Sequence, residues 1–361
     1  MSASDTVGQA QSGIFQGTGD GERRLRDERS TDRTDERSAP AFVFGEELAD
    51  LADHDPRVVV LTADLAKANR AVDFEARHPD RFVNVGIAEK NMITAAAGLA
   101  SCGKVVYAAT FASFAALLGC EQIRTDCAYP GMAVRVVGHH SGMSMGFYGS
   151  SHHALEDLGI MRTLASLTVV CATDANHLRA VLRASLDHPG AMYIRLGRGR
   201  DPEVYADVPA ISFGRAIRLR EGDDLAILAT GSEVRPALDA ADLLAARGVS
   251  ARVVDVHTIK PLDLAEVHAA ADLGVVLTVE EHNVTGGLGT AVAEVLADSG
   301  RSVRLRRHGV PDEYVLIGPP AALYAHYRLD ADGIAAVATE LLEGSTNGRT
   351  GARDTPTEER A

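Results

Sequence analysis

The sequence places four histidines in one Gly- and Ser-rich stretch, as the adjacent pairs His139-His140 and His152-His153. The stretch follows a predicted strand, so the imidazoles are expected in a loop. A metal site would favour histidines at i and i+4 on a helix, or interleaved cysteines and carboxylates. Because adjacent residues point in different directions, hydrogen bonding to substrate oxygens is the favoured interpretation. A helix predicted over 150–162 would place His152 or His153 at its N-terminus, which lowers the imidazole pKa and keeps the ring neutral at pH 7.

A second candidate is the carboxylate of Glu89, in the stretch "RFVNVGIAEKNMITAAAGLASCG". A predicted strand ends at Gly86 and a helix begins near Ala88, so Glu89 falls in the first helical turn. Open α/β sheets bind ligands at the carboxyl ends of their strands. The alternative is that Glu89 only complements the positive end of the helix, and spacing alone does not separate the two.

Two further stretches carry residues that could do chemistry. Phe111 and Phe114 follow a predicted strand, with Thr110 as the expected N-cap, and share one helix face. Spacing alone favours a core role for such a pair.

The segment 230–232 ("TGS") opens a predicted helix where anions can bind, but a tight strand-to-helix turn is favoured. The glycines of "TGGLG" (285–289) lack the spacing of a dinucleotide loop.

The elements that must position these residues alternate between short β-branched runs and longer helical stretches. Strands are expected at 58–62, 82–85, 104–109, 133–137, 167–171 and 192–196, and again at 225–230, 251–256, 274–279 and 302–307. This alternation predicts an α/β fold of two consecutive doubly wound sheet domains, each mostly parallel.

Composition divides the chain further. Polar segments at both ends cannot offset their ordering entropy by burial, and a Gly- and Pro-rich segment separates the two series of strands. The predicted division is a disordered tail (1–39), a first domain (40–198), a linker (199–222), a second domain (223–343) and a disordered tail (344–361).

Charge and composition exclude several classes of function. The 361 residues carry a net charge of -14, which argues against binding to nucleic acid or an anionic membrane. No apolar run approaches the roughly 20 residues needed to span a bilayer, and the N-terminus lacks the apolar region of a signal peptide. The four cysteines show no metal-ligand spacing and are expected to be reduced. Together these features predict a cytoplasmic protein.

With these motifs in view, the chain resembles the C-terminal half of transketolases, and more narrowly the small subunit of split, two-chain transketolases. "NVGIAEKNM", "TFASF", "SSHHALEDLGIMR" and "YIRLGR" resemble the pyrimidine-binding domain of the family. "LATGSEV", "VVDVHTIKPLD", "VEEHNVTGGLG" and "GVPDEY" resemble its C-terminal domain. The resemblance covers residues 41–342 and implies transfer of a two-carbon ketol unit from a ketose to an aldehyde.

The resemblance assigns cofactor roles to residues of the first domain. Glu89 matches the catalytic glutamate that hydrogen-bonds N1′ of the thiamine diphosphate pyrimidine. Phe111 and Phe114 match aromatic positions around this ring, which argues against the core role that spacing favoured. Asp64 matches an acidic position near the cofactor.

It also assigns substrate roles. His152 matches a catalytic histidine that contacts the ketose oxygens, and His140 and Arg198 match positions that bind the sugar phosphate. Tyr148 and His153 are expected to line the same substrate site.

Departures from the family pattern occur at this substrate site. The family usually has Glu-Asp-Gly where residues 147–149 read Phe-Tyr-Gly, and Thr-His-Gln where residues 151–153 read Ser-His-His. Ala41 replaces an expected phosphate-binding arginine. The loss of an acidic hydroxyl partner and of a cation predicts an atypical donor or acceptor, suited to specialised metabolism.

The resemblance implies a partner chain. In this class a Gly-Asp-Gly triplet opens the loop that anchors the metal and the diphosphate. Gly19-Asp20-Gly21 lies in a polar segment with no preceding buried strand and no nearby asparagine, so we interpret it as chance. No metal ligand is therefore expected in this chain, and Mg²⁺ or Ca²⁺ would be held by a large subunit. An α2β2 heterotetramer is expected, in which the isolated small subunit is inactive.

Two alternatives stay open. The β-subunit of a 2-oxoacid dehydrogenase-like enzyme shares this two-domain layout and would pass a two-carbon acyl unit to a lipoyl or acyl carrier. A non-catalytic partner that only scaffolds or regulates the large subunit is the second alternative. The motifs around Glu89 and His152 favour transketolase over both.

Overall fold

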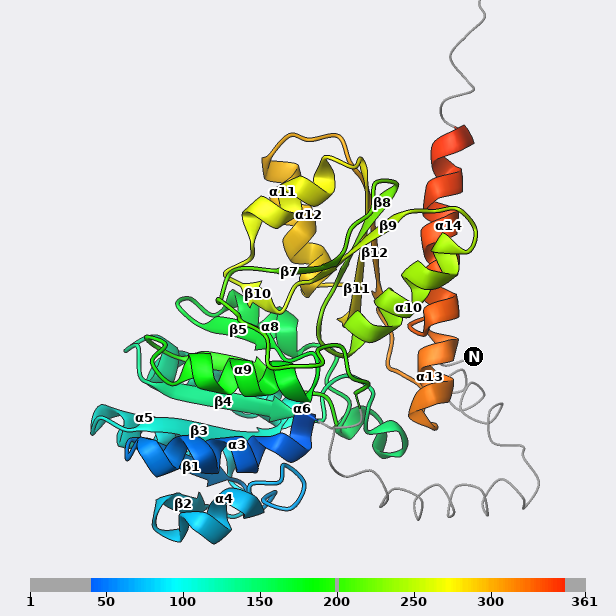
Figure 1. The fold of residues 1–361 in the computed structure, drawn as a ribbon. Coiled ribbons are helices and arrows are strands. Elements are labelled where there is room, and N and C mark those ends of the chain that lie inside the picture. The colour runs from blue at the N-terminus through cyan, green and yellow to red at the C-terminus, as the bar shows by residue number, and fades with distance from the viewer. Residues whose placement is uncertain (1–39, 199–200, 348–361) are drawn as a thin grey trace, which may run out of the picture.

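The computed structural model describes residues 40–198 and 201–347, which form two α/β domains (Figure 1). The strands of the first domain are β1 (Val58–Thr62), β2 (Phe82–Asn84), β3 (Val105–Phe111), β4 (Val134–His139), β5 (Thr168–Cys171) and β6 (Met192–Arg195). Its helices are α3 (Pro40–His54), α4 (Val72–Arg77), α5 (Glu89–Ser101), α6 (Ala112–Leu117), α7 (Cys120–Gln122), α8 (Asp157–Thr163) and α9 (Ala175–Ser185). Shorter helical turns lie at Pro79–Arg81, Ile123–Ala128 and Gly146–Ser151.

The strands of the second half are β7 (Ile217–Arg220), β8 (Leu225–Ala229), β9 (Ala251–Asp255), β10 (Thr258–Lys260), β11 (Val275–Asn283) and β12 (Arg304–Val310). Its helices are α10 (Val234–Ala245), α11 (Leu264–Ala271), α12 (Leu288–Asp298), α13 (Pro320–His326) and α14 (Ala331–Asn347). A short helical turn, Gly231–Glu233, precedes α10.

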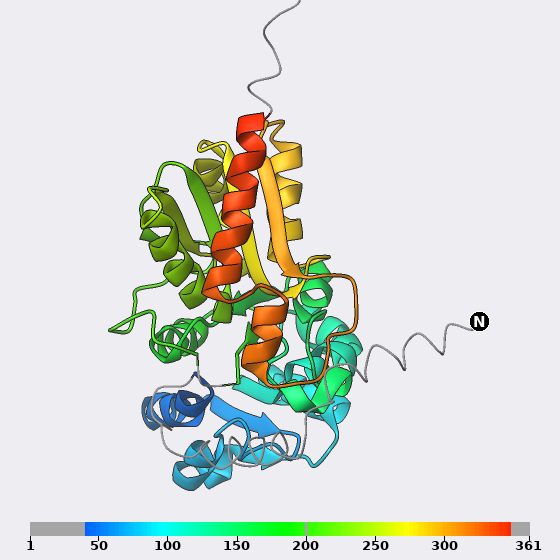
Figure 2. The same cartoon turned by 90° about the vertical axis from the view of Figure 1, so that its right-hand side faces the viewer.

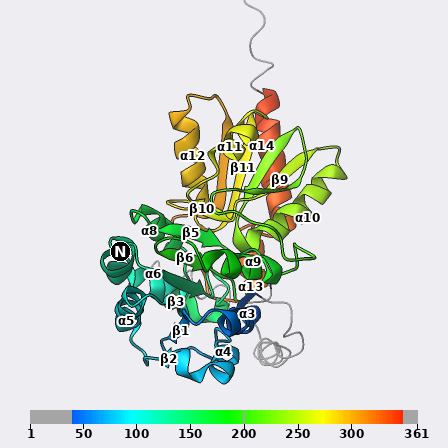
Figure 3. The same ribbon diagram turned by 60° about the vertical axis from the view of Figure 1, so that its left-hand side comes forward.

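The first sheet has the strand order β10-β5-β6-β4-β3-β1-β2, and every strand except β10 is parallel to its neighbours. Helices cover both faces, as Figure 3 shows for α5 and α6 on one side and α3 and α9 on the other. Successive side chains of β1 point to opposite faces of the sheet, and both faces are buried. Val58 and Val60 face α3 and α9, whereas Val59 and Leu61 face α5. The prediction of a doubly wound, mostly parallel sheet is confirmed.

The second sheet has the order β12-β11-β8-β9-β7, and only β7 is antiparallel. Helices α11 and α12 pack on one face, and α10 and α14 pack on the other (Figure 1). Figure 2 shows α13 at the lower end of α14, where it reaches the first domain. The contact is direct, because Pro320 of α13 lies beside Gly146 of the first domain.

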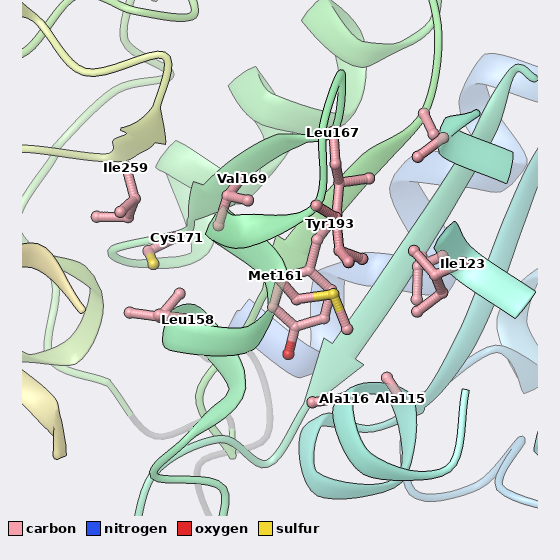
Figure 4. Packing of buried hydrophobic residues seen from close by; sticks show 14 of the residues in the cluster. Ala115, Ala116, Ile123, Leu158, Met161, Leu167, Val169, Cys171, Tyr193 and Ile259 are labelled. Atoms are coloured by element: carbon pink, nitrogen blue, oxygen red, sulfur yellow. The ribbon is translucent and has the colours of Figure 1, made fainter. Parts of the chain in front are cut away.

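The largest hydrophobic cluster spans both domains. Buried side chains of α8 and β5 in the first domain belong to the same cluster as side chains of β9, α11 and α12 in the second. Figure 4 shows Ile259 opposite Cys171 and Val169 at the junction. The four cysteines are free, as expected, and Cys171 at the junction is packed as an apolar side chain.

Several predictions about elements were wrong. The segment 199–222 was expected to be a linker, but it contains β7, which pairs with β9. Strand β10 was not predicted. The helix expected over 150–162 begins only at Asp157, because the preceding residues form a turn and Ala154 pairs with Gly142. Thr110 is a residue of β3 and not a helix N-cap.

The C-terminal helix is longer than expected. Helix α14 continues to Asn347, into the segment that was expected to be a disordered tail from 344 onward. The segments 1–39 and 348–361, including Gly19-Asp20-Gly21, lie outside the described residues, and their predicted disorder stays a prediction.

Candidate active site

The candidate residues gather at the carboxyl ends of neighbouring parallel strands. Phe111 is the last residue of β3, and His139, the last residue of β4, is its register partner. Arg198 follows β6 by a few residues and is exposed. Strand order therefore brings together residues that lie far apart in the sequence, at the edge where open α/β sheets bind ligands.

Glu89 opens helix α5, as predicted. Gly86 adopts a φ of 73°, which turns the chain from β2 toward the helix. The side chain of Glu89 is buried, and its Oε1 accepts a long hydrogen bond of 3.5 Å from the hydroxyl of Thr110. Since Thr110 immediately precedes Phe111, the carboxylate lies next to the end of β3.

Six rings form what we call the aromatic cluster: Phe111, Phe114, His139, His140, Tyr148 and His152. Phe111 lies at its centre. The centroid of its ring is 5.5 Å from that of Phe114, 5.0 Å from those of His139 and His140, and 5.5 Å from that of His152, all edge-to-face. Phe111 and Phe114 thus contact each other, although the first ends a strand and only the second lies within α6.

His140 is held by its backbone in an unusual conformation. Its φ is 56°, and its N–H donates to the carbonyl of Gly197 at 3.1 Å. Burial first of all, together with the positive charges of Arg198 and protonated His152, lowers the pKa of His140 to about 3. The ring is therefore neutral at pH 7 and can act as one donor and one acceptor.

His139, one of the four histidines of the candidate stretch, received no role of its own from the sequence or from the resemblance. Its side chain is 0% exposed, and its Nδ1 lies 2.7 Å from Nδ1 of His140. The expectation that members of an adjacent pair point in different directions is wrong here, because the left-handed conformation of His140 turns its ring back toward His139. No spacing rule in the sequence signals this contact.

The side chains of the second pair, His152 and His153, do point in different directions, as predicted. His152 contacts Phe111, Phe114 and Tyr148, and its Nδ1 pairs with the hydroxyl of Ser151 at 2.8 Å. His153 is buried, and its Nε2 lies 3.2 Å from the carbonyl of Gly146. Neither begins a helix, so the predicted cause of a lowered pKa is wrong: burial lowers the pKa of both rings.

Tyr148 and Asp64 lie at the periphery. Tyr148 is 60% exposed and packs on His152, with ring centroids 4.9 Å apart. Ile317 of the second domain lies against Gly149, so the segment after β12 forms part of the surface around Tyr148. Asp64 follows β1 and is exposed, and its N–H donates to Asn84 at 3.0 Å.

A buried carboxylate of the second domain holds in place the segment 139–153, which carries all four histidines and which we call the histidine loop. Oε1 of Glu281 accepts from the N–H of Met143 at 2.8 Å and from the hydroxyl of Tyr324 at 2.6 Å. Its Oε2 accepts from the hydroxyl of Ser232 at 3.0 Å. Ser232 belongs to the turn Gly231–Glu233, which agrees with the structural interpretation of that segment. Sequence reasoning missed Glu281, because nothing local shows that it reaches another domain.

Neither a metal-binding cluster nor a membrane-spanning helix is found in the described part of the chain. In residues 40–198 and 201–347, no group of three or more His, Cys, Asp or Glu side chains is arranged to hold a metal ion. Within the same ranges, no helix has the length and apolar character to cross a membrane.

Comparisons with known proteins divide the chain into the same two halves, except that β10 of the second half belongs to the first sheet. Residues 39–202 match the family of the transketolase pyrimidine binding domain, and residues 214–334 match that of the transketolase C-terminal domain.

Individual relatives match nearly their whole length. The chain is 36% identical over 302 residues to a subunit of the apulose-4-phosphate transketolase of Phocaeicola vulgatus, covering 83% of this chain and 96% of the relative. It is 40% identical over 297 residues to a 6-deoxy-6-sulfo-D-fructose transketolase subunit of a Clostridium species, covering 82% and 92%. A solved split gene transketolase, an inactive beta4 tetramer, superposes with a TM-score of 0.78 at 40% identity and covers 84% of this chain and 98% of that chain.

Proposed function

The chain belongs to the transketolase family, and we propose that it supplies the pyrimidine and sugar side of an active site completed by a separate large subunit. The enzyme class is a thiamine-diphosphate-dependent transketolase, in which a two-carbon ketol unit passes from a ketose to an aldehyde. The observation that carries the proposal is the buried carboxylate of Glu89, which follows β2, beside the aromatic cluster at the carboxyl ends of β3 and β4.

The residues present fit the pyrimidine end of thiamine diphosphate. Glu89 offers a buried carboxylate whose one described hydrogen bond is a long one, so it retains acceptor capacity for a ring nitrogen. Phe111 and Phe114 offer aromatic surface for a flat ring. When bound, the cofactor supplies a nucleophilic carbon for carbon–carbon bond cleavage. Glu89 would share a proton with N1′ and thereby set the protonation state of the aminopyrimidine. Asp64, two residues after the end of β1, would lie near the cofactor.

The sugar would be bound by the histidines and Arg198. His152 contacts both phenylalanines, which supports a role in binding ketose oxygens next to the pyrimidine. Neutral His140 and the cationic Arg198 would bind a terminal anionic group such as a phosphate. His153 would support the loop, since it bonds Gly146.

Tyr148 would set substrate preference. An exposed tyrosine, where the family usually has an acidic residue, offers a flat ring and one hydroxyl but no carboxylate for a sugar hydroxyl. We therefore propose an atypical donor or acceptor. The named relatives support this idea, since those proteins are subunits of an apulose-4-phosphate transketolase and of a 6-deoxy-6-sulfo-D-fructose transketolase.

The large subunit would hold the diphosphate and its Mg²⁺ or Ca²⁺. Ile87, two residues before Glu89, is 85% exposed, and Leu117 and Leu118 at the end of α6 are also exposed. Such an apolar surface next to the candidate site is suited to burial by another chain. The proposed assembly has two large and two small subunits.

The test is reconstitution of the two subunits and assay of aldose release from a ketose. Glu89→Ala is expected to lower kcat by about 10²-fold or more, because one proton-transfer group typically contributes this much. Glu203→Ala, which removes an exposed carboxylate of the same chain, is the matched control and should be fully active. Thiamine diphosphate binding, followed by calorimetry, gives a second readout.

The alternatives correspond to distinct outcomes. Full activity of Glu89→Ala in the reconstituted pair would show that this chain only scaffolds its partner. Reductive acylation of a lipoyl domain without aldose release would assign the enzyme to the 2-oxoacid dehydrogenase type. Activity of this chain without a large subunit would contradict the proposed division of the site.

A further inference from the structure

We infer that His139 is a positioning residue that fixes the tautomer of His140, so that His140 presents an Nε2–H donor to the substrate. His139 has no place in the function proposed above, and the inference rests on that function only for the identity of the substrate. It concerns the hydrogen bond between the two rings, which can be measured in the absence of catalysis.

The distance between the two Nδ1 atoms requires that one imidazole donates a hydrogen bond to the other. The two Nδ1 atoms lie 2.7 Å apart, which is the distance of a hydrogen bond and too short for two facing lone pairs or two facing N–H groups. A neutral imidazole has one N–H and one lone pair. Burial keeps both rings neutral, since it lowers the pKa of His139 well below its usual range and that of His140 to about 3. One ring must therefore donate to the other.

The rings cannot easily leave this arrangement. Phe111 packs edge-to-face on both, with centroids 5.0 Å from each. The backbone of His140 is anchored by its N–H to Gly197, and that of Ser141 by its N–H to Leu196, each at 3.1 Å. These contacts hold the two Nδ1 atoms face to face, so the choice of tautomer is coupled between the rings.

Burial of His139 decides which ring donates. Its Nε2 is buried and has no hydrogen-bond partner among the described residues. If His140 donated, this Nε2 would carry a buried N–H without an acceptor, and unpaired buried N–H groups are the rarer and more costly case. If His139 donates through Nδ1, only a lone pair is left unpaired. The second arrangement is favoured, and it places the proton of His140 on Nε2.

This arrangement has a chemical consequence for substrate binding. With its Nδ1 engaged as an acceptor, His140 can offer only an N–H from its other nitrogen. Oxygens of a phosphate or another anionic group are acceptors, so the tautomer matches an anionic substrate end. In the other tautomer, Nε2 would present a lone pair to the same oxygens and repel them.

Nitrogen-15 NMR of the full chain, labelled at histidine, tests the inference directly. The His140 signals are assigned by their loss in His140→Gln. In the wild type, we expect Nε2 of His140 to be protonated and its Nδ1 to be the acceptor. His139→Phe keeps an aromatic ring but removes the donor, and we expect His140 to shift to a mixture of tautomers. His139→Asn places an amide N–H close to the position of Nδ1 and is expected to restore the Nε2–H form.

Kinetics of the reconstituted enzyme provide the functional readout. In His139→Phe, KM for a phosphorylated substrate is expected to rise roughly 10-fold or more, while kcat changes less, because a hydrogen bond to a charged group is weakened. His139→Asn should recover most of this loss. A merely structural role for His139 would instead lower stability and leave the tautomer of His140 and the ratio of the two kinetic effects unaltered.

The wild-type spectrum alone can overturn the inference, even if His139→Phe does not fold. A proton on Nδ1 of His140 in the wild type would reverse the direction of the hydrogen bond. An unaltered His140 tautomer in a folded His139→Phe would show that His139 does not set it. Failure of the function proposed above would appear as full activity of Glu89→Ala and would leave the NMR result standing.

Discussion

Gly142 in the first domain lies directly against the carboxylate of Glu281 in the second, so that a Cβ on Gly142 would be 2.0 Å from Cδ of Glu281. Gly142 also has a φ of 62°, which disfavours any residue with a side chain. The histidine loop and the second domain therefore fit together only because this position carries no side chain.

Gly142→Ala is expected to destabilise the chain strongly. The left-handed backbone costs about 1–2 kcal/mol for a residue with a Cβ. The methyl group would in addition displace Glu281, whose carboxylate binds Met143 and Tyr324. Displacing this buried carboxylate adds a further ~1–3 kcal/mol. Urea unfolding, followed by circular dichroism, measures the change in the free energy of unfolding.

Gly103→Ala is the matched control for this effect. Gly103 has a φ of 83°, but a Cβ there would meet nothing within 4 Å. It should show only the backbone cost of about 1–2 kcal/mol. Equal losses in the two variants would contradict a specific contact between Gly142 and Glu281.

Exchange of Tyr148 for an acidic residue should alter substrate preference. Tyr148→Asp is expected to raise kcat/KM for D-xylulose 5-phosphate about 10-fold, since a hydrogen bond from a sugar hydroxyl to a carboxylate is worth at least ~1.5 kcal/mol. Because Tyr148 is mostly exposed, the change should leave the stability unaltered. Steady-state kinetics of the reconstituted enzyme provide the measurement. Tyr148→Phe, which removes only the hydroxyl, should give no such gain, and an equal gain in both variants would contradict the prediction.

Asp255 should make the chain less stable as pH rises from about 4 to 7. Burial raises the pKa of Asp255 from 3.8 to about 7, although the hydroxyls of Thr173 and Tyr205 donate to its Oδ2. The folded chain thus binds a proton that the unfolded chain releases in this window. The free energy of unfolding therefore falls with rising pH, by up to about 1.4 kcal/mol per pH unit.

Asp255→Asn should remove this contribution, as measured by urea unfolding at pH 5, 6, 7 and 8. The free energies of unfolding of the variant and the wild type must be compared at each pH, because other groups also titrate. Buried His257, for example, has a pKa lowered to about 4, so below pH 6.5 it makes the free energy of unfolding rise with pH. Asp298→Asn, at an exposed carboxylate, is the control. Parallel stability curves for the wild type and Asp255→Asn would refute the prediction.

The sequence predicted most of the fold because most strands are buried on both faces. Runs such as those of β1 and β8 are entirely apolar or β-branched and have no other stable location. The missed strands lack this signal. Strand β7 reads Ile-Arg-Leu-Arg at a sheet edge, and β10 has three residues. Edge strands and short strands are stabilised by their neighbours, which local patterns do not show.

The site was predictable where a residue ends an element and unpredictable where a loop folds back. Glu89 could be placed in the first turn of α5 from the strand-to-helix transition alone. The approach of His139 to His140 depends on one left-handed residue, and the burial of His153 depends on a turn that contains Gly149 at a φ of 68°. These conformations are held by residues distant in the sequence, such as Gly197 for His140 and Ile317 for Gly149, which the sequence of the loop does not encode.

The antiparallel strand β10 has a consequence for how such enzymes can be rearranged in evolution. It is contributed by the second half of the chain but completes the sheet of the first half at β5. A cut near residue 210 would leave β5 with an open edge and remove part of the shared core, and an open edge invites aggregation. The two domains are therefore expected to be inherited, fused and swapped between relatives as a pair, with gene fission tolerated ahead of them and not between them.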